Sequence, residues 1–502
     1  MKTSTPMSTP VALHDILAEV TQTCRPHDPQ TGHAPHAMVV FPPSPSARPT
    51  PLDATALGTR PAEDAQPYAL FIAIDWADDH HDLCVLDPVT QQRTHQRLEH
   101  DPAALHAWLA DLHRRFPGRK LAVALEQKTG SLFNLLVEDN GLDLYPMNPA
   151  MVAKYRKALH PSGAKDDPTD ADLILDLLTL HREKLAVLRP DDPLTRQLQR
   201  LSRQRRETVH LRTQFSNRLT ALLKQYYPLF LRICGDDLFA PMACQLLLDY
   251  PSFDALKQAD SEALRHFYTT HGSWKPAVIA HRLQVIRDAQ PLTTDAAIIQ
   301  PAILDATMLA RLLQQVNESI AAYDRAIAGL FPQHPDAPIF ASLPGAGAVF
   351  APRLLTAFGT DRTRFDTAAQ VQNTTGISPV TQASGTMRVV HWRPACSKFL
   401  RQSFQEYANE SIRHSLWARA YYQMQRDRGK RHQVAVRALA FKWIRVMFAC
   451  WQTRQPYDEL RYLRSLQQRH APLLEYLSKN DQVFGQETTP SSSPKTRRKT
   501  AM

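Results

Sequence analysis

Paired cysteines and long apolar runs are both missing from this sequence. Its six cysteines are scattered, and none forms a C-x-x-C pair. This argues against a zinc site and against a disulfide scaffold, and it suits a reducing cytoplasm. No uninterrupted apolar run of about 18 residues occurs, so we expect no membrane partner and no membrane-spanning helix. No basic segment followed by an apolar stretch begins the chain, so we expect no secretory signal and a cytoplasmic protein.

The chain is long and basic. Its 502 residues exceed what one compact core holds, so we expect two or three domains. Lys and Arg number 59 against 49 Asp and Glu, a formal net charge of +10. This balance favours a polyanionic partner, nucleic acid before membrane. Composition leaves the alternative open, because many basic proteins bind nothing anionic.

Both ends of the chain lack a regular pattern. Residues 1–66 are rich in proline, and we interpret them as a mostly disordered leader with at most one short helix, around Val11–Val20. Residues 461–502 are interpreted as a helical extension and a basic tail that is disordered from about Gln486. The main folded domains are therefore expected between residues 67 and 460.

Residues 67–190 have the pattern of a mixed α/β domain. Apolar runs predict strands at Ala69–Asp75, Asp82–Leu86, Thr94–Leu98, Leu121–Leu125 and Leu142–Tyr145, and helices at Leu105–Leu112 and Ser131–Glu138. The spacing of the first three strands implies an antiparallel meander. A meander followed by alternating helices and strands is the ribonuclease-H-like order, one topology among several. His80 and His81 fall in the turn between the first two strands, where we expect surface residues.

Residues 191–333 are predicted to be helical. Apolar residues recur every three or four positions from Leu194 to Leu222, where Arg205 and Arg212 interrupt the seam, and again from Leu309 to Leu330. We expect an antiparallel coiled-coil arm with a helical insertion, at about 228–300, at its tip. The seam either packs the two helices together or pairs two protomers.

A mainly helical domain is predicted at residues 334–460. In it, Leu343-Pro-Gly-Ala-Gly347 lies between apolar helical runs and resembles a helix-hairpin-helix turn. In such a turn, glycines such as Gly345 and Gly347 let backbone N–H groups approach a phosphate closely. Pro-Gly turns are common, so this pattern alone is a weak indication of nucleic-acid binding.

A basic segment lies further along the same domain. Its cations Arg428, Lys430 and Arg431 would neutralise phosphates, with an affinity that depends on salt. A solvated helix face is an equally good interpretation.

Acidic residues follow two of the predicted strands. Asp75 ends the first strand, and Glu126 comes directly after Leu121–Leu125. This pattern predicts both carboxylates at one edge of a sheet. For either residue alone, a charge where a strand meets water is an equally good interpretation.

Two more carboxylates occur in Ala164-Lys-Asp-Asp-Pro-Thr-Asp-Ala. Asp167 is a good N-cap, and Asp170 is favourable in a first helical turn. Capping needs only one of them, and their spacing of three predicts both on one helix face. Facing Asp75 and Glu126, they would supply the oxygen ligands that Mg²⁺ (or Mn²⁺) requires. Two ions about 4 Å apart would activate one oxygen and stabilise the other in phosphodiester cleavage.

The order of these motifs resembles the RuvC-like domain of DEDD transposases in the insertion-sequence one-ten family. The matching segments are Ile74-Asp75, Ala124-Leu-Glu126-Gln and Ala164-Lys-Asp-Asp167-Pro-Thr-Asp170-Ala. The resemblance covers roughly residues 70–460. It implies a ribonuclease-H-like (RuvC-like) domain and a transposase whose metal ligands are Asp75, Glu126, Asp167 and Asp170.

The resemblance extends to a serine. Family members carry Leu-Pro-Gly-x-Gly, then Gly-hydrophobic-x-Pro, then Ser-Gly in a loop, which are matched by Leu343–Gly347, Gly376-Ile-Ser-Pro379 and Ser384-Gly385. By similarity, Ser384 is the nucleophile that becomes joined to DNA, and Gly385 lets the scissile phosphate come close. Ser-Gly is a common loop dipeptide, so only the resemblance singles out Ser384. The chain departs from the family at Arg393–Arg401, where many members have Lys-Arg-Gly-Asn.

The resemblance also implies partners. Such enzymes recombine double-stranded DNA in the bacterial nucleoid, work as homo-oligomers (a dimer or a tetramer), and are guided by a structured RNA of their own element that pairs with DNA. One alternative is a metal-dependent nuclease of the Holliday-junction-resolvase type, in which Ser384 is idle. Another is a non-catalytic nucleic-acid-binding relic. The variants Ser384→Ala and Asp75→Ala distinguish these functions.

Overall fold

The computed structural model describes residues 68–126, 130–159, 167–235, 237–273, 275–385, 387–474 and 476–477. The leader at 1–66, with the helix predicted around Val11–Val20, and the basic tail lie outside these residues. The chain separates into two compact units, Met1–Pro190 and Asp191–Met502. Each unit contains its own buried apolar cluster.

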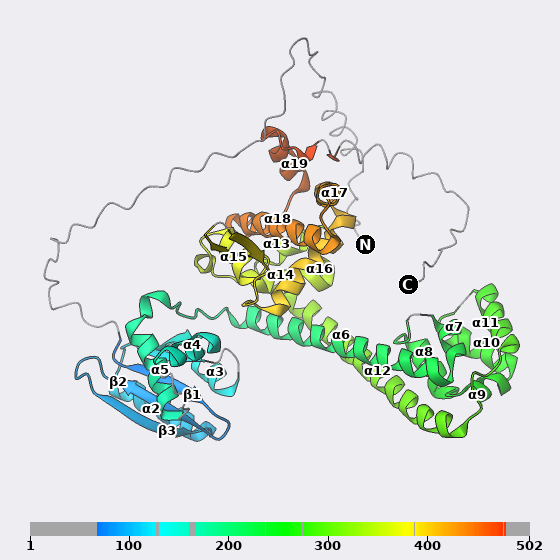
Figure 1. Cartoon of the computed structure of the whole chain (residues 1–502), viewed down its shortest axis with the longest axis horizontal. Helices are drawn as coiled ribbons and strands as arrows, with labels where there is room; N and C mark the ends of the chain where they lie inside the picture. Colours follow the sequence, from blue (N-terminus) through cyan, green and yellow to red (C-terminus); the bar gives the residue numbers. More distant parts are fainter. Residues whose placement is uncertain are drawn as a thin grey trace, which may run out of the picture. The chain divides into compact units, whose positions relative to one another are not determined.

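A five-stranded mixed sheet forms the centre of the first unit (Figure 1). In the order β3-β2-β1-β4-β5, its strands are β3 (Arg93–Glu99), β2 (His80–Leu86), β1 (Phe71–Trp76), β4 (Leu121–Leu125) and β5 (Leu142–Pro146). β2 is antiparallel to both β1 and β3, whereas β4 is parallel to both β1 and β5. The predicted antiparallel meander is confirmed, and so are the two later strands.

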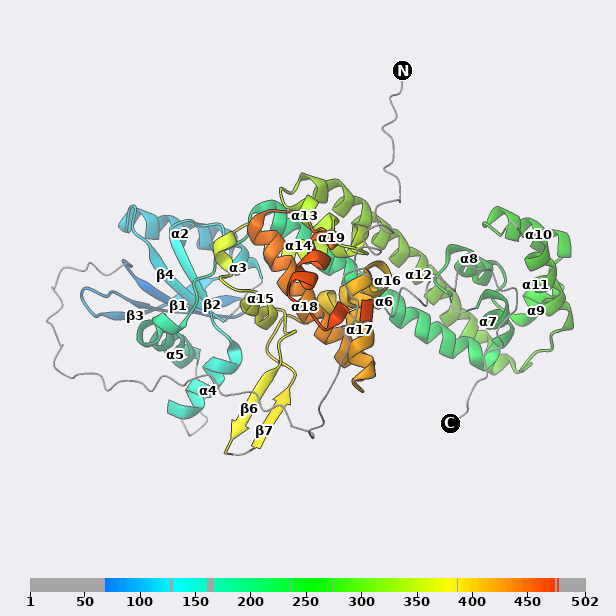
Figure 2. The same ribbon diagram turned by 90° about the horizontal axis from the view of Figure 1, so that it is seen from above.

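Helices cover both faces of this sheet (Figure 2). They are α2 (Pro102–Arg115), α3 (Ser131–Leu136), α4 (Pro149–Leu159), α5 (Asp167–Leu180) and the short 3-10 helix η1 (Arg182–Lys184). Residues such as Ile72 and Val123 face α2 and α3. Ala73 and Ala124 alternate with them and face α5, and their small side chains let that helix pack closely on the sheet.

Two long helices dominate the second unit, α6 (Pro193–Tyr226) and α12 (Ala296–Leu330). They are antiparallel, because ion pairs join Arg205 to Asp324 and Arg218 to Asp305. The chain between them forms a helical insertion: α7 (Pro228–Cys234), α8 (Pro241–Asp249), α9 (Phe253–Gln258), α10 (Ser261–Thr270) and α11 (Pro276–Asp288). These helices share one apolar cluster with α6 and α12. Two antiparallel helices and an insertion agree with the expectation, and coiled-coil packing stays a prediction.

The two arginines that interrupt the apolar seam of α6 both have partners. Arg205 Nε lies 2.5 Å from Asp324 Oδ1 on α12. The Arg212 guanidinium lies 4.3 Å from the centroid of the Phe239 ring, and its Nη1 lies 3.5 Å from Asn317 Oδ1. A long cationic side chain is tolerated at a helix interface when its stem packs and its charged end is satisfied.

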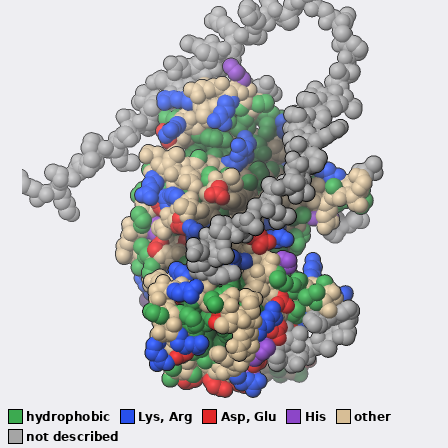
Figure 3. All heavy atoms as spheres, turned by 90° about the vertical axis from the view of Figure 1, so that its left-hand side faces the viewer, with side chains coloured by type: hydrophobic (Ala, Val, Ile, Leu, Met, Phe, Trp, Pro, Cys, Tyr) green, Lys and Arg blue, Asp and Glu red, His purple; other side chains and the backbone are tan. Residues whose placement is uncertain are grey.

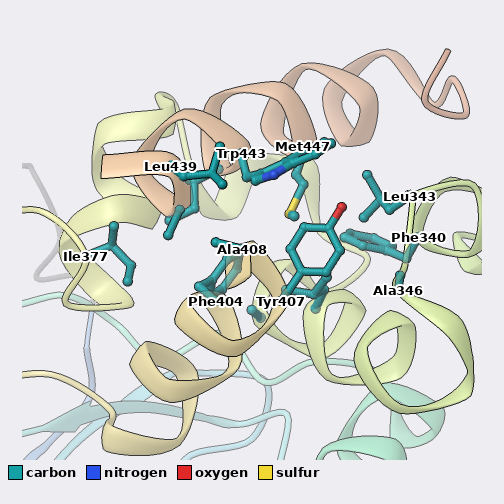
Figure 4. Close-up of a cluster of buried hydrophobic side chains, with 14 of the residues drawn as sticks. Phe340, Leu343, Ala346, Ile377, Phe404, Tyr407, Ala408, Leu439, Trp443 and Met447 are labelled. Atoms are coloured by element: carbon teal, nitrogen blue, oxygen red, sulfur yellow. The ribbon is translucent and has the colours of Figure 1, made fainter. Parts of the chain in front are cut away.

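The rest of the second unit is mainly helical. It contains η2 (Phe331–Gln333), α13 (Ala337–Ala341), α14 (Gly347–Phe358), η3 (Arg362–Arg364), α15 (Ala368–Thr374), the strands β6 (Val380–Ser384) and β7 (Met387–His391), α16 (Lys398–His414), α17 (Leu416–Asp427), α18 (His432–Thr453) and α19 (Glu459–Gln468). Figure 4 shows Trp443 of α18 in its core, beside Tyr407. The Trp443 ring lies 4.5 Å from that of Trp417, and its Nε1 donates a hydrogen bond to Ser411 Oγ at 2.8 Å.

One described helical stretch, Ala296–Gln333, is long and apolar enough to cross a membrane by length and composition, although no uninterrupted apolar run occurs there. Leu309 and Leu313 of this stretch are buried in the cluster that α6 shares. Asp305 and Asp324 pair with arginines of α6. We therefore interpret the stretch as the core helix of a helix pair.

The prediction that His81 lies at the surface is wrong. His81 belongs to β2 rather than to a turn, and its side chain is completely buried. Alternation along β2 puts His81 on the same face as Leu83 and Val85, which pack under α2 and α3. His80 begins the same strand and is half-buried.

Candidate active site

Asp75 and Glu126 extend two neighbouring parallel strands at one edge of the sheet. The residues before them, Ile74 of β1 and Leu125 of β4, are in register with each other and belong to the core under α2 and α3. Successive side chains of a strand point to opposite faces. Asp75 and Glu126 therefore lie side by side on the face that α5 covers, and both are half-buried.

Helix α5 brings Asp170 to the same edge. Asp172 accepts a hydrogen bond from Cys84 Sγ (3.0 Å), and Asp176, one turn later, accepts one from Arg93 Nη2 (2.5 Å). In the register of the sheet, Cys84 lies nearer than Arg93 to the edge that carries Asp75 and Glu126. The helix therefore starts at this edge and runs away from it, so that Asp170, in its first turn, lies close to the strand ends.

Asp170 is buried and pairs with a cation of α4. Its side chain is 7% exposed, and Arg156 Nη2 lies 2.6 Å from its Oδ1. Among the described residues, this buried oxygen has a charged neighbour but no hydrogen-bond donor. Asp167 is the first residue of α5, and its side chain lies outside the described part of the structure.

The residues at this edge fit a hard divalent cation by their chemistry. Asp75, Glu126 and Asp170 offer carboxylate oxygens, and within the described part of the chain no hydrogen-bond donor reaches Asp170 Oδ1. Their oxygens do not form a group within 4.8 Å of one another. The ion pair with Arg156 is consistent with this separation of the three carboxylates, because it holds the carboxylate of Asp170 against α4.

A second group of metal-type donors lies further along α5. Atoms of Cys84, His95 and Asp172 lie within 4.8 Å of one another, and Arg93 Nη1 lies 3.6 Å from the same Asp172 carboxylate. Burial, followed by the hydrogen bond to Asp172, raises the pKa of the Cys84 thiol to about 12. With a protonated thiol and a guanidinium beside the carboxylate, we interpret the group as a hydrogen-bond network that holds α5 on the sheet.

A histidine network on the opposite face was not anticipated from the sequence. His81 Nε2 lies 2.8 Å from His100 Nδ1, and His100 Nε2 lies 2.8 Å from Ser131 Oγ. Burial, followed by the neighbouring charge of His100, lowers the pKa of His81 to about 4. The sequence does contain a signal for this burial, because His81 lies two residues before Leu83 and so on the same face of a strand. The signal was missed because the second strand was predicted to begin at Asp82.

Ser384 is the last residue of β6 in an exposed two-stranded hairpin, not a loop residue as expected. Ser384 pairs with Met387 of β7, and both are exposed. Gly385 follows in the turn with φ +55°, a conformation that favours glycine. In the described part of the chain no side chain hydrogen-bonds to the Ser384 hydroxyl, so no adjacent base is identified there.

The Leu-Pro-Gly-Ala-Gly turn joins α13 to α14. Gly345 has φ +74°, and a Cβ atom at this position would lie 2.6 Å from Cδ2 of His414. Gly347 begins α14 with φ +50° in open space. A side chain at Gly345 would therefore be strained by the positive φ and would have to displace His414, whereas Gly347 leaves room for an approaching group.

The basic segment joins α17 to α18. Arg428, Lys430 and Arg431 are exposed there. None of them makes an ion pair with a described residue, so their charges face solvent. On the face of the molecule in Figure 3, Lys and Arg side chains are interspersed with Asp and Glu. Asp427 directly precedes the segment, so the segment is basic but not free of carboxylates.

Comparison with known proteins identifies related sequences. Residues 72–228 match the DEDD transposase model of IS110, and residues 337–423 match the transposase IS116/IS110/IS902 family. A mini-circle putative transposase for IS117 of Streptomyces coelicolor is 28% identical over 412 residues, which is 80% of this chain and 98% of the relative. The IS110 uncharacterized 43.6 kDa protein of that organism is 28% identical over 391 residues, 77% of this chain and 95% of the relative. The IS900 uncharacterized 42 kDa protein of Mycobacterium paratuberculosis is 27% identical over 409 residues, which is 78% of this chain and 98% of the relative.

These matches define the chain as a DNA transposase, and hence as an enzyme. More specifically, it belongs to the IS110 family of insertion-sequence transposases. The resemblance inferred from the acidic motifs and the Leu-Pro-Gly-Ala-Gly turn is therefore confirmed at the level of the family.

Proposed function

We propose that this transposase cuts and rejoins DNA with a metal-binding carboxylate site in a ribonuclease-H-like domain and with Ser384 as the nucleophile. One observation carries the metal site: Asp75, near the end of β1, and Glu126, directly after β4, lie at neighbouring positions on the face where α5 begins. Asp170, in the first turn of α5, and Asp167, at its start, complete the set. When bound, Mg²⁺ or Mn²⁺ neutralises phosphate charge and activates an attacking oxygen.

Ser384 acts on the phosphodiester in this proposal. Its exposed position at the end of β6 leaves the hydroxyl accessible to a DNA backbone. Oγ attacks phosphorus and forms a phosphoserine ester, the bond from phosphorus to one DNA oxygen breaks, and the hydroxyl proton ends on that oxygen. Attack by a DNA hydroxyl on the ester restores the serine, so the ester conserves energy for rejoining.

Nucleic-acid contacts and guidance form the third part of the proposal. Gly345, Gly347 and Gly385 allow phosphates to approach the backbone, and Arg428, Lys430 and Arg431 neutralise them. Family membership supports a structured guide RNA that reads the double-stranded DNA by base pairing. It also supports a homo-oligomer, dimer or tetramer, acting in the bacterial cytoplasm.

The test measures cutting of a labelled donor DNA and formation of a covalent protein–DNA adduct in Mg²⁺. Asp75→Asn should abolish cutting, whereas Glu99→Gln, an exposed carboxylate at the end of β3, should not. Ser384→Ala should remove the adduct, and Thr381→Ala, another exposed hydroxyl of the hairpin, should retain it. An adduct formed by Ser384→Ala would exclude the serine mechanism. Cutting by that variant without strand exchange would instead favour the resolvase-like nuclease.

A further inference from the structure

A cavity of about 480 Å³ lies between α18 and α19, apart from the residues proposed above. Figure 1 shows α19 above α18, and residues of both helices line the cavity. Four cations line this cavity together with two aromatic residues: Lys442, Arg445, Arg461, Arg469, Tyr457 and Tyr462. A volume of this size lies in the range of small-molecule sites, about 300–1,000 Å³, and admits a nucleotide.

The cations of the cavity have no carboxylate partner within the described part of the chain. Asp458 is the one carboxylate in the lining, and its Oδ1 accepts hydrogen bonds from the backbone N–H groups of Leu460 and Arg461 as the N-cap of α19. No ion pair of Lys442, Arg445, Arg461 or Arg469 occurs among the described residues. Burial and then the charge of Arg445 lower the pKa of Lys442. An anion in the cavity would relieve this repulsion.

The arginines converge on the cavity from two helices. Burial raises the pKa of Tyr462, and the positive charges of Arg445 and Arg469 oppose that rise. Arg461 likewise opposes the rise that burial causes for the Cys450 thiol, which also lines the cavity. These opposing effects agree with the presence of Arg445, Arg461 and Arg469 in the lining of the cavity.

The remaining wall is aromatic and apolar. The Tyr457 hydroxyl accepts a hydrogen bond from Trp417 Nε1 at 2.7 Å, and the Tyr462 ring lies 4.8 Å from that of Trp417. These contacts hold both rings in place, next to Val446 and Ala449. Cations beside a fixed aromatic wall are the combination that binds a phosphate together with an unstacked base.

We propose that this cavity binds one nucleotide of a single-stranded nucleic acid. Its phosphate contacts Arg445, Arg461 and Arg469, and its base packs against the tyrosine wall. A base within a duplex is stacked on its neighbours and cannot enter, so the site selects an unpaired segment. This inference rests on the proposed function in one respect. The single strand is taken to come from the nucleic acid on which the transposase acts.

The test uses the full-length protein in a chelator, so that the carboxylate site takes no part. Fluorescence anisotropy measures binding of single-stranded RNA and DNA of about 12 nucleotides and of a matched duplex. Arg461→Glu should weaken single-strand binding about tenfold and reduce the slope of log affinity against log salt by about one. Arg464→Glu has the same charge change at an exposed position of α19 outside the cavity, and it should have a much smaller effect.

A second variant separates the cavity from the overall charge. Ala449→Phe fills the cavity without changing the net charge, and it should weaken binding of the single strand but not of the duplex. Equal effects of Arg461→Glu and Arg464→Glu, or unchanged binding by Ala449→Phe, would overturn the proposal. So would competition by inorganic phosphate as effective as that by a mononucleotide. Failure of the proposed cleavage mechanism is distinguishable, because it would appear in the Asp75→Asn and Ser384→Ala assays while binding in chelator stays intact.

Discussion

Arg156 Nη2 lies 2.6 Å from Asp170 Oδ1, which joins α4 to the first turn of α5 at the sheet edge that carries Asp75 and Glu126. The pair is largely buried, with side-chain exposures of 25% and 7%. A guanidinium at this position compensates the carboxylate charge as a divalent cation would. Arg156 and a metal ion are therefore expected to compete for Asp170.

The first prediction concerns this competition. Arg156→Gln leaves Asp170 without its cation, so without divalent metal the variant should lose stability on the order of 3 kcal/mol. Added Mn²⁺ should then raise its melting temperature more than that of the wild type. Thermal unfolding in chelator and in Mn²⁺ measures both effects. Lys120→Gln, which removes a more exposed pair with Asp143, is the control. Equal responses of Arg156→Gln and wild type to Mn²⁺ would contradict the idea.

The second prediction concerns pH. The unfolded chain protonates His81 near pH 6.5, whereas burial lowers the pKa of this side chain to about 4 in the fold. Between these values the unfolded state binds more protons, so the contribution of His81 to stability falls as the pH drops from 6.5 to about 4, by about 3 kcal/mol. Urea unfolding across this range should show a shallower pH dependence for His81→Leu. The exposed His106→Gln should retain the wild-type slope, and an unchanged slope in His81→Leu would refute the assignment.

The third prediction concerns the two long helices. Arg205 is 18% exposed and its partner Asp324 45%, so a double-mutant cycle with alanine at each position should give a coupling energy of about 1 kcal/mol. The pair of Arg218 and Asp305 is more exposed, at 57% and 47%, and should give less. Chemical denaturation of the four variants of each cycle measures the two couplings. A larger coupling for the outer pair would show that burial does not determine their strength.

The fourth prediction concerns the turn between α13 and α14. Gly345→Ala adds both a strained positive φ and a contact with His414, so it should destabilise the protein by about 2 kcal/mol. Gly347→Ala meets only the strain and should cost about 1 kcal/mol. Combining Gly345→Ala with His414→Ala should recover the part that is due to the contact. Thermal unfolding measures the loss of stability in each variant. If the losses of the two single variants add up to that of the double variant, no such contact forms.

Local pattern was sufficient to predict the elements that carry the candidate site. The apolar run before Asp75 and the one before Glu126 predicted β1 and β4, and the Asp-Pro pair at Asp167 predicted the start of α5. Local pattern failed at His81 and at Ser384. A strand of mixed polarity has no apolar run to mark its start, and the exposed β6 and β7 have no buried face to mark their alternation.

By itself, the sequence determined the order of strands and helices, the acidic residues that follow the strands, and the family, because each depends on residues close together in the chain. Only the tertiary structure decided that Arg156 neutralises Asp170, that His81 is buried beside His100, and that cations of α18 and α19 line one cavity. These are contacts between side chains on different elements. The spacing of apolar residues predicts which face of a helix or strand is buried, but it does not predict which other helix or strand covers that face.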